Sequence, residues 1–146
     1  MAKVHQETIV TADVEKCFDF IADPEKAPLF VSSLHSVNPI SVAPKGVGNS
    51  WNWEYDLFGL PLKGSAKCLA YERPNKYVWS SNEIFPSTWT YTFQKVDGGT
   101  KIMLDIEYEI PKNALTGKIT DKFMLEKMNQ QQADTGFRNL KTVLES

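Results

Sequence analysis

The acidic side chains are the first candidates for chemistry, because a pair of carboxylates can act as general acid and general base. Glu54 and Asp56 alternate with apolar residues in one predicted strand, and Asp105, Glu107 and Glu109 do so in another. Residues two apart in a strand share a face, and the aromatic and aliphatic residues here occupy the opposite face. We therefore expect these carboxylates on the solvated face, and we predict no catalytic residue among them.

The histidines and cysteines lack the spacing of a metal site. His5 and His35 are isolated, and Cys17 and Cys68 do not form a CxxC pair. His35 follows the second predicted helix, where a single histidine is more often structural than functional. We expect no metal and no cofactor, and we expect both thiols to be reduced.

Motifs for nucleophilic and phosphate chemistry are also absent from the sequence. Gly46-Val47-Gly48 does not open a helix after a strand, so it is not a phosphate loop, and no GxSxG nucleophile elbow occurs. Glu83 and Asn82, near the end of a predicted strand, are less easily assigned to a face. The sequence leaves enzymatic activity open and favours a protein without turnover.

Length and composition narrow the class of protein. The 146 residues suit one domain, residues 1–146, and 42% hydrophobic with 23% charged residues is typical of a globular protein. A formal net charge of −2 gives no general attraction to nucleic acid or anionic membranes. No apolar run reaches the ~18 residues of a membrane span, and the first residues lack the apolar core of a signal peptide. We expect a cytoplasmic protein without a nucleic-acid partner or membrane segment; a protein partner and the oligomeric state stay open.

Two short helices are predicted near the N-terminus. In the first, apolar residues recur at helical spacing, with Thr11 or Asp13 available as N-cap, and Asp23-Pro24 ends it. The second piece must be short or begin near Pro28, because proline is not tolerated deep inside a helix. The two apolar sets are Val14, Cys17, Phe18 and Ile21, then Ala27, Phe30, Val31 and Leu34.

From Ser36 to Ile110 the apolar period changes to two, which predicts strands. Five turn segments divide this stretch into six strands, and connections this short can join only antiparallel neighbours. With Val4–Val10 they make a predicted sheet of about seven strands. The turn segments are Pro44–Gly46, Phe58–Pro61, Arg73–Lys76, Phe85–Ser87 and Asp97–Gly99.

Alternation assigns one face of this sheet to apolar side chains. In the strand Leu60–Glu72 the inner residues are mostly small. Bulky side chains of neighbouring residues in the sheet either fill the volume above these small residues or leave it open. The predicted inner residues are Trp51, Trp53, Tyr55 and Leu57; Leu62, Gly64, Ala66, Cys68 and Ala70; Trp89, Tyr91 and Phe93; and Ile102, Leu104, Ile106, Tyr108 and Ile110.

A helix predicted over Asn113–Glu145 should cover the aromatic face. Its apolar stripe changes phase across Asn129–Gln132, which predicts a bend or break between Lys127 and Gly136. The glutamines at 130–132 are either solvated or in contact with a ligand head group, and Gln132 is the preferred contact because it follows Leu125 and Met128 at helical spacing. The expected buried stripe is Ala133, Phe137, Leu140 and Leu144.

Four stretches resemble the START-like (SRPBCC) superfamily, within its polyketide cyclase/dehydrase and lipid-transport group. They are IVTADVEKCFDFIADPEKAPLF, YERPNKYVW, TYTFQKVDGGTKIMLDIEY and FRNLKTVLES. The resemblance implies an α+β helix-grip fold, in which a curved sheet wraps the C-terminal helix around a deep apolar cavity. It also implies binding of a lipid, sterol, isoprenoid quinone, polyketide or plant hormone, and no catalytic residue carries over from it.

These observations predict a protein that binds a small hydrophobic molecule as carrier, chaperone or sensor. The alternatives are an aromatase/cyclase-type enzyme, which would be a cyclase or dehydratase, and a module that docks a protein partner. We expect a cavity of roughly 300–1,000 Å³, and whether each aromatic residue lines it or fills the core stays open. The predicted lining residues are Trp51, Trp53, Tyr55, Ala66, Cys68, Trp89, Tyr91, Phe93, Ile106, Tyr108, Met128, Gln132 and Phe137.

Overall fold

The computed structural model describes residues 2–31, 33–39, 46–57, 59–82, 86–109 and 122–146, with backbone alone at 2, 39, 57, 60 and 122–125. The predictions for Glu83, Ile110 and the helical segment 113–121 lie outside these ranges. The elements are β1 (Ala2–Val10), α1 (Val14–Ile21), the 3-10 helix η1 (Pro24–Leu29), β2 (Leu34–Pro39), β3 (Ser50–Leu57), β4 (Leu60–Glu72), β5 (Lys76–Ser81), β6 (Ser87–Val96), β7 (Gly99–Tyr108) and α2 (Lys122–Leu144).

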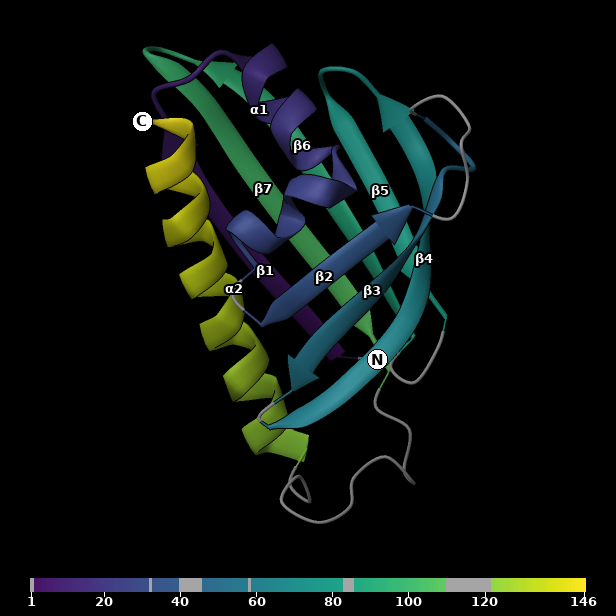
Figure 1. Ribbon diagram of the computed structural model, residues 1–146. Helices are drawn as coiled ribbons and strands as arrows, with labels where there is room; N and C mark the ends of the chain where they lie inside the picture. The colour runs from purple at the N-terminus through teal and green to yellow at the C-terminus, as the bar shows by residue number, and fades with distance from the viewer. Residues whose placement is uncertain (1, 32, 40–45, 58, 83–85, 110–121) are drawn as a thin grey trace.

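The strands form one seven-stranded antiparallel sheet in the order β1-β7-β6-β5-β4-β3-β2. β2 to β7 follow one another as a meander, and β1 pairs with β7 from Ala2–Tyr108 to Val10–Thr100. Figure 1 shows that the sheet curls, so that β2 and β3 pass in front of β6 and β7, with α2 along the open side. This is the helix-grip α+β fold that the sequence predicts.

The first predicted helix is confirmed, and the second differs from its prediction. α1 has Asp13 at its N-cap position and buries Cys17, Phe18 and Ile21. The second piece is the 3-10 helix η1, which begins at Pro24 and contains Pro28, while Leu34 already belongs to β2. A short 3-10 helix tolerates this proline because it has few internal hydrogen bonds to lose.

Alternation is confirmed in the described parts of β3, β6 and β7, but it fails in the second half of β4. The carboxylates Glu54, Glu107 and Glu109 are on the exposed face. In β4 the register shifts between Cys68 and Ala70. A bulge of this kind reverses the alternation, so Tyr71 packs against the core in the place expected for Ala70.

The helix α2 runs without a break from Lys122 to Leu144, so of the predicted bend or break the break is wrong. Phe137, Leu140 and Leu144 are buried as expected. The apolar stripe changes phase because polar residues of α2 also lie on its inner side. One of them is Gln130, whose side-chain nitrogen donates to the backbone oxygen of His5 in β1 at 3.1 Å. The neighbouring polar residues face a cavity instead of the solid core. No helix in the described part of the chain is long and apolar enough to cross a membrane.

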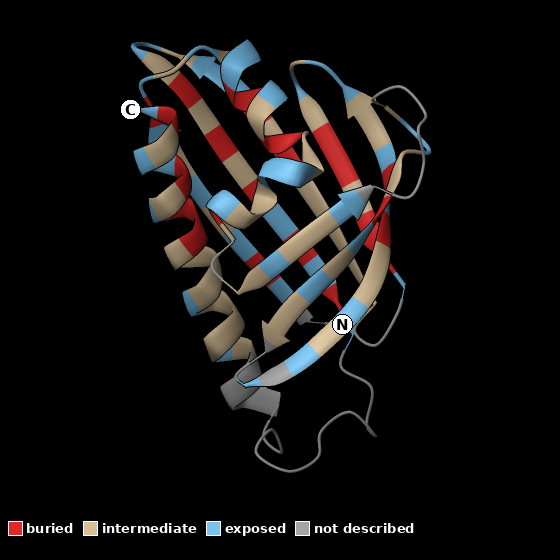
Figure 2. Ribbon diagram, in the orientation of Figure 1, coloured by how far each residue is buried: buried red, intermediate tan, exposed pale blue. Residues whose placement is uncertain are grey.

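The solid core occupies one end of the grip. Phe18 lies at its centre and packs edge-to-face on Tyr71 and Phe93, with ring centroids 5.0 and 5.3 Å away. Figure 2 shows buried residues along α1, β7 and the C-terminal half of α2, whereas residues 126–135 of α2 are partly buried or exposed. The fully buried packing therefore ends near the middle of α2.

Candidate ligand-binding site

A cavity of about 210 Å³ lies between the concave face of the sheet, η1 and α2. Every strand contributes to its wall, from Val4 in β1 to Leu104 in β7, and η1 closes it with Ala27. Its volume is below the 300–1,000 Å³ range expected from the sequence. The space therefore suits a compact ligand.

The structure brings most of the predicted lining residues together around this cavity. Four of the predicted residues lie elsewhere: Ala66, Cys68 and Phe93 are buried in the core, and Met128 is half-buried on α2 outside the cavity wall. The predicted residues that line the cavity are Trp51, Trp53, Tyr55, Trp89, Tyr91, Ile106, Tyr108, Gln132 and Phe137.

The small residues of β4 do not open onto the cavity, because indole rings fill the space over them. Ala66 pairs across the strands with Trp51, and Cys68 pairs with Trp79. The two indoles pack edge-to-face with ring centroids 5.9 Å apart. Bulky and small side chains therefore interlock here, and the void lies over the neighbouring strands.

Several lining residues escaped the sequence prediction. Tyr77 and Trp79 alternate along β5, so the period of two could have assigned them. Phe30 and Leu34 lie beyond the end of η1 and at the start of β2, where a 3-10 helix gives no simple period. Asn129 is polar, so the apolar pattern of the sequence could not identify it as a residue that faces the cavity.

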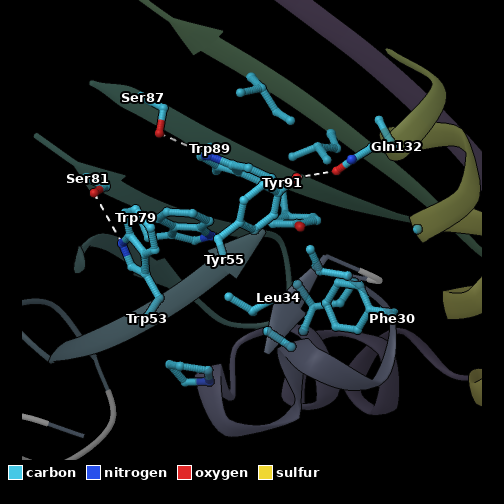
Figure 3. Close-up of a pocket in the computed structure, with 18 of the residues that line it drawn as sticks. Phe30, Leu34, Trp53, Tyr55, Trp79, Ser81, Ser87, Trp89, Tyr91 and Gln132 are labelled. Atoms are coloured by element: carbon cyan, nitrogen blue, oxygen red, sulfur yellow. Dashed lines mark hydrogen bonds between the residues drawn. The ribbon is translucent and has the colours of Figure 1, made fainter. Parts of the chain in front are cut away.

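The floor of the cavity is built from two rows of aromatic rings on β5 and β6. Trp79 and Trp89 are directly opposite each other and stack with centroids 4.7 Å apart at 18°. In the next row Tyr77 and Tyr91 stack with centroids 6.4 Å apart at 28°. Figure 3 shows Trp79, Trp89 and Tyr91 around the same open space. The rows present a broad apolar surface to anything held there.

The indole nitrogens of two lining tryptophans are satisfied within the protein. Trp53 Nε1 donates to Ser81 Oγ at 3.3 Å, and Trp89 Nε1 donates to Ser87 Oγ at 3.2 Å (Figure 3). Ser81 in turn donates to the backbone oxygen of Ser65 at 2.7 Å. Ser81 and Ser87 are paired across β5 and β6, so they form a polar row beside the aromatic floor.

A hydrogen bond joins the sheet to α2 across the cavity. The hydroxyl of Tyr55 in β3 donates to the side-chain oxygen of Gln132 (Figure 3). Burial raises the pKa of Tyr55 to about 12, so this hydroxyl is a neutral donor at pH 7. Gln132, which the sequence predicts as a polar contact for a ligand, already has this partner inside the protein.

No described residue of the cavity wall carries an Asp, Glu, Lys, Arg, His or Cys side chain. His35 is exposed, and its Nε2 lies 3.8 Å from Oδ2 of Asp56. The tyrosines are the ionisable groups that the described wall provides. The described wall is therefore electrically neutral, and an ion placed against it would lose its hydration without gaining a counter-charge from it.

The family described as polyketide cyclase/dehydrase and lipid transport matches residues 1–145 of this chain. The chain belongs to this family. Its members bind hydrophobic ligands or act as cyclases, which agrees with the resemblance of the four sequence stretches. The search of curated proteins finds no match.

Solved structures of the same fold cover nearly all of this family member. A START superfamily protein from Mycobacterium smegmatis has a TM-score of 0.79 at 11% identity, over 99% of this chain and 98% of that chain. TTHA0849 from Thermus thermophilus has a TM-score of 0.78 at 18% identity, over 96% of this chain and 94% of that chain. The di-domain ARO/CYC StfQ from the steffimycin biosynthetic pathway has a TM-score of 0.78 at 13% identity, over 99% of this chain and 50% of that chain. At these identities the likeness shows the fold alone.

Alkaline pH is expected to destabilise the protein through its cavity tyrosines. Burial raises the pKa of Tyr55 to about 12 and also raises the pKa of Tyr77 and Tyr91. An unfolded tyrosine loses its proton near pH 10, so above that pH the unfolded chain binds fewer protons than the folded protein. The free energy of unfolding should therefore be unaffected by these groups below about pH 9 and should fall between about pH 10 and 12.

Urea unfolding at a series of pH values, with tyrosinate absorbance followed in parallel, measures this effect. Tyr91→Phe serves as the control, because removing one buried hydroxyl should make the fall shallower. Ionisation of Tyr91 near pH 10 in a still-folded protein would contradict the prediction.

Proposed function

We propose that this protein binds a compact, neutral, hydrophobic molecule in the cavity between the sheet and α2, as a carrier, chaperone or sensor. The observation that carries this proposal is a cavity walled by aromatic and aliphatic side chains, without a charged side chain among the described residues. An apolar ligand would remove this surface from water at a gain of roughly 25 cal/mol for each Å² of apolar area. The proposed contact residues are the predicted residues that line the cavity, together with Tyr77 and Trp79.

The size of the cavity selects among the hydrophobic ligands that the sequence leaves open. At about 210 Å³ it is smaller than pockets that enclose most drug-sized ligands. A long acyl or isoprenoid chain would need the grip to widen, whereas a small ring compound needs less rearrangement. We therefore propose a ring-containing ligand before a long-chain lipid, and a cytoplasmic site of action as the sequence predicts.

The cyclase alternative has less support. General acid–base catalysis uses groups whose pKa lies near the working pH, and the described cavity wall has no carboxylate or imidazole. The likeness to the di-domain ARO/CYC StfQ concerns the fold. A docking module for a protein partner has no observation of its own in its favour.

Filling the cavity tests the proposal. Ala133 lines the cavity from α2, so Ala133→Leu should occupy the open volume and lower affinity for an apolar ligand by about tenfold or more. Its effect on the free energy of unfolding should be small, because leucine is a good helix former and enters empty space. Binding is measured by calorimetric titration with 2-acetylnaphthalene, a neutral ring ketone, and stability by urea unfolding.

Ala66→Leu is the matched control, because Ala66 is 4% exposed and lies in the core outside the cavity. The same substitution should overpack there and cost about 1–3 kcal/mol. Equal stability losses for the two variants, with unchanged binding by Ala133→Leu, would remove the cavity as the binding site. Native mass spectrometry of the purified protein should in addition detect a co-purifying small molecule.

A further inference from the structure

The tyrosine hydroxyls of the cavity wall differ in whether the protein satisfies them. Tyr55 has Gln132 as its partner. Tyr77 and Tyr91 are each 3% exposed, and neither hydroxyl forms a hydrogen bond with any residue in the described ranges. The hydroxyl of Tyr108 is enclosed by protein atoms and lies beside the side chain of Asn129. The open, unpartnered donors are therefore Tyr77 and Tyr91.

Unpartnered hydroxyls are an unusual feature for the interior of a protein. At least nine in ten buried polar groups have a hydrogen-bond partner, and a buried group without one costs about 1–3 kcal/mol. The hydroxyls of Tyr77 and Tyr91 are open to the cavity, so a molecule held there can supply the partner that the described wall does not. The indoles of Trp53 and Trp89 in the same wall, by contrast, have partners inside the protein, on Ser81 and Ser87.

The two tyrosines are placed to act together. They are opposite residues on β5 and β6, on the same face, and their rings stack with centroids 6.4 Å apart at 28°. Both side chains line the cavity, directly beside the stacked Trp79–Trp89 pair. A molecule lying on the indole pair therefore meets two neighbouring phenol groups at one end.

We propose that Tyr77 and Tyr91 form a recognition site for a neutral carbonyl oxygen, on a ligand whose apolar body lies against Trp79 and Trp89. This inference rests on the proposed function and adds the polar group that the ligand must carry. Burial raises the pKa of both tyrosines, so both stay protonated donors at neutral pH. A carboxylate is disfavoured, because the described wall offers it no cation and burial removes its hydration.

Three probes of similar shape separate the contribution of the carbonyl oxygen to binding from those of the apolar body and of a negative charge. They are 2-acetylnaphthalene, 2-ethylnaphthalene and 2-naphthoate, and their affinities are measured by calorimetric titration. The wild-type protein should bind the ketone about three- to tenfold more tightly than the hydrocarbon for each hydroxyl engaged. It should bind the carboxylate most weakly. The infrared stretch of the bound ketone carbonyl should shift to lower frequency, as expected for a hydrogen-bonded carbonyl.

The double variant Tyr77→Phe/Tyr91→Phe should bind ketone and hydrocarbon equally and should lose the infrared shift. Tyr71→Phe is the matched control, because Tyr71 packs against the core outside the cavity wall, and it should keep the preference. If ketone and hydrocarbon bind the wild type equally, or if the carboxylate binds best, the carbonyl site is wrong while the apolar cavity stands. If none of the three probes binds, the proposed function fails as well.

Discussion

Phe137→Ala is expected to lower the free energy of unfolding by about 3–5 kcal/mol. Phe137 is 4% exposed and belongs to the core cluster that holds α2 against the sheet, together with Leu140 and Leu144. Its removal loses the transfer free energy of the ring and enlarges the existing cavity, because the surrounding helix and strands relax only in part. Urea unfolding followed by circular dichroism measures the loss.

Phe20→Ala provides the comparison for this prediction. Phe20 is only partly buried and packs beside Phe30, with the Lys26 ammonium 5.5 Å from its ring. Its truncation should cost clearly less than that of Phe137, because less apolar surface returns to water. Equal losses in the two variants, or a loss under about 1 kcal/mol for Phe137→Ala, would place Phe137 outside the stabilising core.

Gly99→Ala is expected to destabilise the protein by about 3 kcal/mol or more. A Cβ atom at Gly99 would lie 1.9 Å from the backbone oxygen of Val10 and 3.2 Å from the Cα of Thr11. These are main-chain atoms at the end of the β1–β7 pairing, where the chain turns toward α1. They cannot move aside without breaking the Val10–Thr100 register, so the added methyl group has no space.

Gly98→Ala in the same turn tests whether the cause is close approach or backbone conformation. Gly98 has a φ of +80°, but a Cβ atom there would meet nothing within 4 Å. Alanine at Gly98 should cost about 1 kcal/mol through left-handed strain alone. Melting temperatures of the two variants should therefore differ clearly, and a smaller loss for Gly99→Ala than for Gly98→Ala would show that the contact with Val10 is relieved at low cost.

Local pattern was enough to predict the sheet and most of its inner face. The period of two in β3, β6 and β7 assigned Trp53, Trp89 and Ile106 to the concave side, because a pleated strand alternates its side chains strictly. Turn residues at Asp97–Gly99 and the other connections predicted antiparallel neighbours, and the structure confirms the meander. Helical spacing likewise predicted α1 and the buried stripe of α2.

The local sequence pattern failed to predict the structure where the packing of two elements against each other decides it. The bulge between Cys68 and Ala70 reverses the alternation of β4, and no residue type near it in the sequence predicts it. The phase change in α2 predicted a bend or a break, whereas the helix continues unbroken and its polar residues Asn129 and Gln132 face the cavity. A helix can present polar side chains inward at no great cost when the space in front of them is not solid core.

The order of strands, the aromatic face and the helix that covers it are all readable from the sequence, because they follow from periodicity and turn chemistry along the chain. The tertiary structure alone decided where the open volume lies. Trp51 and Trp79 cover Ala66 and Cys68, so the void opens beside Tyr77 and Tyr91 instead. Packing between strands distributes volume, and the sequence of any one strand carries no information about the side chains that its neighbours place over it.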